Sequence, residues 1–320
     1  MSRARDALRR ALANRTSPFL GIAVMVASTI AFAGMHAGVR YLSVKEQLHP
    51  FEIAFFRNFF GLLALAPWFI RQGLAPLRTQ RLSLHVVRAL INVVAMLAFF
   101  MGLSLTPIAQ VQALGFTAPL WATLLAIFFL REKVLVWRWS ALIIGFIGAL
   151  IIIRPGIKAV DLGSLLVLAS AATWACAIII IKMLSRTDSS VTITAYMVLL
   201  MTPLSLIPAA FFWQWPTAEQ FVWLAFIGLS GTLAQMAMTQ AFRMADATAV
   251  LPLDFMKLIW GAMIGYALFG EVPDAGIWIG GATVFAAATY IAYRESQIRT
   301  GLEDLEKTRA SAIPSRSKTP

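Results

Sequence analysis

The sequence predicts an all-α membrane protein with ten transmembrane helices, arranged as two inverted-topology five-helix repeats. Three observations support this fold class. Apolar residues make up 59% of the chain and charged residues only 13%, with a mean hydropathy of +0.77. The apolar residues form runs of about 20 residues, the length that crosses roughly 30 Å of hydrocarbon. Stretches of the first half also recur in the second half at a nearly constant offset.

Ten apolar runs follow one another between short polar breaks. Only helices and closed barrels satisfy their backbone hydrogen bonds in lipid, and these runs are too long and continuous for barrel strands. The first run continues to Tyr41, beyond the core of a signal peptide, so we expect it to be retained as a helix. The predicted spans are residues 19–41, 51–70, 83–104, 107–130, 135–153, 162–183, 191–212, 219–244, 247–269 and 274–293.

The placement of lysine and arginine predicts the orientation of these spans. Of the 27 such residues, twenty fall in segments on one side, four fall on the other, and Arg57, Arg88 and Lys257 fall within spans. Cytoplasmic segments carry the excess of Lys and Arg, and ten spans place both termini on one side. We therefore expect both termini in the cytoplasm. The net charge of +12 is explained by topology, and we expect no nucleic-acid partner.

Two pairs of segments carry the internal repeat. At an offset of 139 residues, Phe116 aligns with Phe255 and Glu132 aligns with Glu271, while the first span aligns with the sixth at an offset of 142. Five spans per repeat is an odd number, so the second repeat must enter the membrane inverted, as is typical of secondary transporters with a midplane site. We divide the chain into a basic cytoplasmic arm at 1–17, a first repeat at 18–154, a second repeat at 160–294 and a disordered cytoplasmic tail at 295–320.

Charged residues within the spans are candidate substrate contacts, because a charge in hydrocarbon needs a cavity or a partner. Asp254 and Lys257, at i and i+3, share a helix face. They form either a self-neutralising ion pair or a site in which Lys257 meets an anionic group or Asp254 takes a proton. Arg57 lies deep in the second span, and Arg88 either snorkels to the interface or joins the site. None of the four has a charged counterpart in the other repeat, which favours a functional role.

Other polar and aromatic residues are weaker candidates. His36 is expected to be a hydrogen-bonded core histidine or a proton sensor, and with no second ligand nearby it predicts no metal site. Prolines interrupt the fourth and ninth spans and free carbonyls towards a cavity. A GxxxG face at Gly276 and Gly280 favours close helix packing, either within the chain or in a dimer. The expected hydrogen-bonding and stacking walls of the site are Asn92, Gln235, Gln240, Trp174 and Trp260.

The chain resembles the EamA-type ten-helix members of the drug/metabolite transporter superfamily over residues 19–293. The resemblance lies in the arginine of FFRNFF in the second span and in two helix-to-glutamate stretches, APLWATLLAIFFLREKV and PLDFMKLIWGAMIGYALFGEVPD. It implies a secondary carrier of the bacterial inner membrane that moves small organic metabolites by alternating access through a central cavity. It also implies no cofactor, and a scaffold role for Glu132 and Glu271.

The expected cargo follows from the residues in the spans. Arg57 and Lys257 outnumber Asp254, which favours a carboxylated or otherwise electron-rich metabolite, either derived from an amino acid or a vitamin such as riboflavin. We expect no enzyme, since no ATP-binding loop or catalytic motif is found. Two alternatives remain: a non-transporting assembly or sensor subunit, and an intramembrane enzyme built on His36 and Asp254. The protein is expected to be a monomer or a homodimer; direction and coupling ion are left open.

Overall fold

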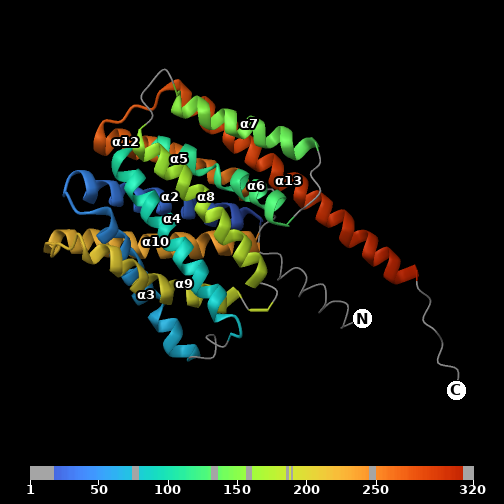
Figure 1. Ribbon diagram of the computed structural model, residues 1–320, viewed down its shortest axis with the longest axis horizontal. Coiled ribbons are helices and arrows are strands. Elements are labelled where there is room, and N and C mark those ends of the chain that lie inside the picture. The colour runs from blue at the N-terminus through green and yellow to red at the C-terminus, as the bar shows by residue number, and fades with distance from the viewer. Residues whose placement is uncertain are drawn as a thin grey trace.

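The computed structural model describes residues 18–73, 79–130, 136–155, 161–184, 187–188, 190–244 and 250–312, and all regular elements in these ranges are helices (Figure 1). The basic arm, Glu132 and the last residues of the tail lie outside these ranges. In the first half the helices are α2 (Pro18–Val44), α3 (Pro50–Gln72), α4 (Leu82–Leu105), α5 (Ile108–Gly115), α6 (Ala118–Leu130) and α7 (Val136–Ile153). In the second half they are α8 (Leu162–Leu184), α9 (Ser190–Ala210), α10 (Ala218–Met244), the 3₁₀ helix η2 (Leu251–Phe255), α12 (Met256–Phe269) and α13 (Ala275–Ala312).

Seven helical segments of the described ranges are long and apolar enough to cross a membrane. This confirms a multi-pass helical membrane protein. The predicted fourth and ninth spans are each broken into two pieces. The fourth divides into α5 and α6, two residues before Pro119, and Pro252 lies in the first turn of η2, ahead of α12. Both breaks follow from proline, which cannot donate a backbone hydrogen bond within a helix.

Helix packing relates the two halves by an approximate two-fold exchange. The helices of the first half correspond in order to those of the second: α2, α3, α4, α5 and α7 to α8, α9, α10, α12 and α13. Helix α2 packs on α10, which corresponds to α4. In the same way, α8, which corresponds to α2, packs on α4. The helices α3, α5 and α7 each pack on their own counterparts, and α7 lies along α13 at one edge of the bundle (Figure 1). Phe116 and Phe255, which the repeat aligns, stack with their ring centroids 5.9 Å apart. This aligned pair therefore meets between the halves.

Polar contacts gather ten helix ends at one end of the bundle, which we call the Arg40 end. There lie the C-terminal ends of α2, α4, α7, α9 and α12 and the N-terminal ends of α3, α5, α8, α10 and α13. Consecutive segments therefore run in opposite directions through the bundle. The contacts that join these ends are Arg40–Glu271, Thr106–Asp161, Arg154–Asp274, Gln214–Glu52 and Gln220–Glu46.

Small residues allow the closest helix approaches. A Cβ on Gly148 of α7 would lie 2.9 Å from the carbonyl oxygen of Gly280 of α13, and a Cβ on Gly280 would lie 2.6 Å from the oxygen of Gly148. The GxxxG face is therefore used within the chain, which is one of the two interpretations left open by the sequence. Gly38 of α2 likewise lies against Ile227 of α10.

The C-terminal tail differs from the prediction. Disorder was expected from residue 295, but α13 continues as one helix to Ala312 and its C-terminal part projects from the bundle (Figure 1). The reason lies in residue type, because residues 295–312 are rich in Glu, Leu, Arg and Ala, which are strong helix formers, and contain no proline.

Candidate functional site

A buried histidine marks the centre of the candidate site. His36 of α2 is 8% exposed, and its Nδ1 lies 2.7 Å from Nε2 of Gln112 on α5. Its ring packs against Phe99 of α4, with centroids 5.1 Å apart, and against Phe32 one turn earlier on α2. Three helices of the first half thus meet at His36, which is hydrogen-bonded as predicted.

The second half contributes a lysine to this centre. Lys257, in the first turn of α12, has its Nζ 2.5 Å from Oδ1 of Asp254 in η2. The same Nζ lies 4.6 Å from the ring centroid of Phe32, a cation–π distance. The ion pair, one of the two alternatives that the sequence left open, is formed, and Phe32 links it to the His36 cluster. An ammonium group has three N–H donors, so Lys257 can donate to a further group while it stays paired with Asp254. We call His36, Gln112, Phe32, Asp254 and Lys257 the central cluster.

Trp260 ties α12 to α2 beside this cluster. Its indole Nε1 donates to Oγ1 of Thr29 at 3.1 Å, and Thr29 donates to the carbonyl of Val26 at 2.7 Å. The indole is therefore held in a fixed orientation, as a rigid wall requires.

Arg57 and Arg88 occupy different surroundings. Arg57 of α3 donates to Oδ1 of Asn58 at 3.0 Å, and its Nε lies beside Gly231 of α10. Within the described residues no carboxylate pairs with it. Arg88 of α4 is buried and donates to the carbonyl of Ile193 on α9 at 2.8 Å, so it is held by the protein and does not snorkel.

Asn92 lies one turn beyond Arg88 on α4. Its side chain is buried, and among the described residues its Oδ1 has no hydrogen-bond partner. Arg88 thus lies at the α4–α9 contact and Asn92 follows it one turn on; neither has a described contact with a member of the central cluster.

Three predicted wall residues are not brought into the central cluster. Gln240 is exposed. It lies two helical turns after Leu233 and one turn after Met236, so it shares its face of α10 with these two exposed side chains. Trp174 is half exposed on α8, and its neighbour one turn on, Ile178, is exposed as well. Gln235 is partly buried. Helix periodicity places Gln240 on the outward stripe, so it does not form the predicted wall.

Gln112, Phe32 and Phe99 are the members of the site that the prediction missed. A polar residue in an apolar span, as Gln112 is, was the available signal. Conversely, the enzyme-like pairing of His36 with Asp254 is not seen, because His36 bonds Gln112 and Asp254 pairs with Lys257.

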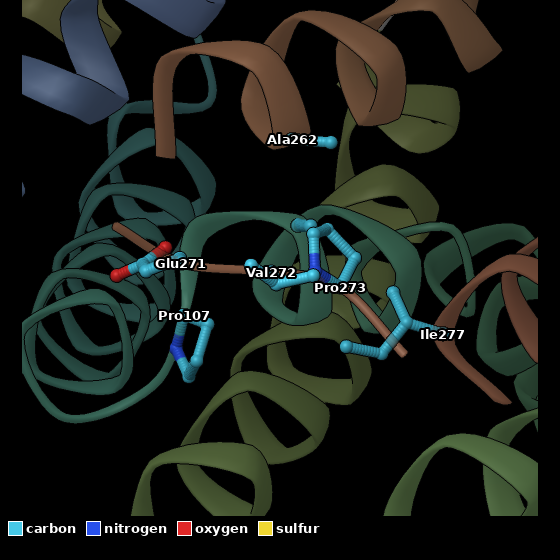
Figure 2. Close-up of a pocket in the computed structure, with 7 residues that line it drawn as sticks. Pro107, Ala262, Glu271, Val272, Pro273 and Ile277 are labelled. Carbon is cyan, nitrogen blue, oxygen red and sulfur yellow. The ribbon is translucent and has the colours of Figure 1, made fainter. Parts of the chain in front are cut away.

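A pocket of about 90 Å³ lies at the Arg40 end (Figure 2). Pro107 and Glu271 lie on one side of it and Ile277 lies on the other. Metabolite sites usually measure about 300–1,000 Å³. This pocket is therefore too small to hold a metabolite. The candidate site is the central cluster, which joins the two halves through polar groups.

A bundle of two related halves with charged residues enclosed between them defines the class of membrane transport proteins. The sequence profile of the EamA-like transporter family matches residues 19–154 and again residues 161–293. The chain belongs to the EamA-like transporter family.

Two relatives match nearly the whole chain. A riboflavin transporter of Vibrio cholerae is 34% identical over 284 residues, covering 88% of this chain and 95% of the relative. An S-adenosylmethionine uptake transporter of Rickettsia bellii is 31% identical over 278 residues, covering 87% and 95%. A solved crystal structure aligns with a TM-score of 0.54 at 17% identity, covering 82% of this chain and 95% of that one, and shows a shared fold.

Proposed function

We propose that this protein carries a small organic metabolite across the bacterial inner membrane by alternating access. The central cluster is the observation that carries the proposal. It joins α2 and α5 of the first half to η2 and α12 of the second, and it places a lysine and a carboxylate among buried residues. In secondary transporters of two repeats, substrate binds between the halves, often at broken helices. Both relatives described above are named as transporters.

The proposed topology is ten spans, in an inverted pair of repeats at 18–154 and 160–294, with both termini in the cytoplasm. The alternation of segment direction and the exchange of packing partners between the halves support it. The Arg40 end would then be the outer end, in agreement with the few lysines and arginines expected there.

The proposed substrate is a metabolite with a flat heteroaromatic ring and an electron-rich or carboxylate group. Riboflavin and S-adenosylmethionine, the compounds in the names of the relatives, both contain a fused heteroaromatic ring. Phe32 and Trp260 would contact the ring, and Lys257 and Arg57 would attract the electron-rich group. Arg88 and Asn92 would form a further polar contact on the cytoplasmic side of the path.

Counterflow in proteoliposomes tests the proposal. Vesicles loaded with unlabelled riboflavin, or with unlabelled S-adenosylmethionine, should take up the labelled compound faster than empty vesicles. Lys257→Ala should abolish this uptake. Lys45→Ala, which removes a cation from an exposed position, should not. No counterflow of either compound by the wild-type protein, or full activity of Lys257→Ala, would contradict the assignment.

A further inference from the structure

Glu52 is a buried carboxyl that the proposed substrate site does not use. It lies in the first turn of α3 and is 0% exposed. Its Oε2 accepts a long hydrogen bond, 3.3 Å, from the backbone N–H of Gln214, and among the described residues its Oε1 has no partner. By contrast, Glu271 pairs with Arg40 and Asp254 pairs with Lys257. Glu52 is thus a carboxyl enclosed in the bundle without a described cation beside it.

An aromatic segment covers this carboxyl. Gln214 belongs to residues 211–217, which connect α9 to α10 and which we call the connector. Phe212 of the connector stacks on His49, with centroids 3.8 Å apart, and Trp213 packs on Phe56 of α3. Other connector side chains face outward, since Phe211 and Trp215 are about 80% exposed. The connector therefore separates Glu52 from the surface at the Arg40 end.

Few titratable groups surround Glu52 at this end. His49 precedes α3, and its Nδ1 accepts from the N–H of Phe51. Glu46 accepts from Tyr41 and Gln220. The titratable and charged groups of α4 and α9, which also pack on α3, lie near the opposite end of the bundle. In full, the groups on the packed elements are His36, Arg40 and Tyr41 on α2, Lys45 and Glu46 after it, His49 before α3, Arg57 and Arg71 on α3, His85 and Arg88 on α4, Tyr196 on α9, and Glu219 and Arg243 on α10.

Two opposing effects act on the Glu52 carboxyl. Burial without a cation beside it disfavours the charged form and favours the protonated carboxyl. The N-terminal end of α3 favours a negative charge, but by less than burial disfavours it. If the connector moves away, water solvates the group and the helix end then supports the anion. The protonation state therefore depends on whether this end is closed.

We propose that Glu52 is a proton-binding site whose occupancy is coupled to closure of the Arg40 end. One proton binds the carboxylate when the connector closes over α3, and the same proton leaves to water when the connector opens. If the chain is the transporter proposed above, this exchange supplies a coupling proton to the transport cycle.

Hydrogen–deuterium exchange of residues 211–217 tests the site without a substrate. In nanodiscs, after correction for the intrinsic pH dependence of exchange, the wild-type connector should exchange faster as the pH rises. Glu52→Gln, which mimics the protonated acid but cannot release a proton, should still open and close, and its connector should exchange at a rate that no longer changes with pH. Glu219→Gln, an exposed carboxyl at the same end, should respond like the wild type. A pH response that persists in Glu52→Gln, or that is absent from the wild type, would overturn the proposal.

A transport measurement separates this site from the proposed function. Glu52→Gln should retain riboflavin or S-adenosylmethionine counterflow but lose accumulation driven by a pH gradient, with a final concentration ratio of about 1, since without coupling a carrier only equilibrates its substrate. Gradient-driven accumulation by Glu52→Gln would overturn the proposal, and so would loss of counterflow by a folded Glu52→Gln protein. If the wild type transports neither compound, the proposed function fails, and the exchange experiment alone decides the proton site.

Discussion

Arg40 near the end of α2 and Glu271 after α12 are separated by 231 residues, yet Nε of Arg40 lies 2.5 Å from Oε1 of Glu271. Arg40 Nη1 also donates to the carbonyl oxygens of Leu103 and Thr106 at the end of α4, both at 2.8 Å. The second oxygen of Glu271 accepts from the N–H of Ile108 at the start of α5. Two side chains thus join four helix ends, taken from both halves of the chain.

Glu271→Ala should destabilise the protein strongly, because it leaves Arg40 as an uncompensated charge that is only 12% exposed. Removing one partner of a buried pair costs about 3–5 kcal/mol. Arg154→Ala is the matched control, since the side chains of the Arg154–Asp274 pair are 26% and 38% exposed and such pairs contribute about 0–1 kcal/mol. Reversible unfolding in mixed micelles measures both. Equal losses for the two variants would show that the Arg40 pair is no more than a surface contact.

The Lys257–Asp254 pair distinguishes a structural role from a binding role. If the pair serves only to neutralise itself, the double variant Asp254→Asn with Lys257→Met should transport normally, because it removes both charges together. We expect instead a folded protein whose counterflow rate falls by at least about tenfold, the loss of ~1.4 kcal/mol of interaction with the substrate. Initial rates in proteoliposomes, with thermal stability measured in parallel, check this. Normal rates in the double variant would remove Lys257 from the site.

Contacts between residues close in sequence were predictable, and those across the bundle were not. The pairing of Asp254 with Lys257 follows from helix geometry, since residues at i and i+3 share a face. The bond between His36 and Gln112 joins residues 76 apart and depends on how α2 and α5 pack, which periodicity does not specify. Glu271 was expected to have a scaffold role, but its partner Arg40, 231 residues away, was not predicted, for the same reason.

Span positions were also easier to predict than side-chain directions. The apolar runs predicted helices because length and hydropathy decide what enters a bilayer, and seven helical segments of the described residues are long and apolar enough to cross one. The direction of Gln240 was missed because α10 is apolar on most of its surface. Its sequence therefore does not distinguish the face that points outward from the face that is buried. The helical tail to Ala312 was missed because polar composition was given more weight than helix propensity.

Asp188 predicts a dependence of stability on pH at the end of the bundle opposite Arg40. The hydroxyl of Thr79 donates to its carboxylate at 2.7 Å and lowers its pKa below the ordinary value of 3.8; burial opposes this, and His85, also at 2.7 Å, supports it. A folded pKa below the unfolded one stabilises the protein above the unfolded value, and the gain is lost as the pH falls through the folded value. Asp188→Asn should therefore lower the melting temperature at pH 7. This deficit should shrink below about pH 4, and a deficit that is constant from neutral to acid pH would exclude the linkage.

Gly280 predicts how tightly α7 and α13 pack. In Gly280→Ala the new Cβ would lie 2.6 Å from the carbonyl oxygen of Gly148 and 3.2 Å from the N of Ile152, and neither backbone atom can turn aside as a side chain does. Overpacking of this kind costs about 1–3 kcal/mol. Gly115→Ala is the control, because nothing lies within 4 Å of a Cβ placed there. Unfolding in micelles should show a clear loss of stability for Gly280→Ala and little change for Gly115→Ala. Because the glycine face is buried inside one chain, Gly280→Ala should leave the particle size in size-exclusion chromatography unchanged; a dimer lost in this variant would instead place that face between two copies.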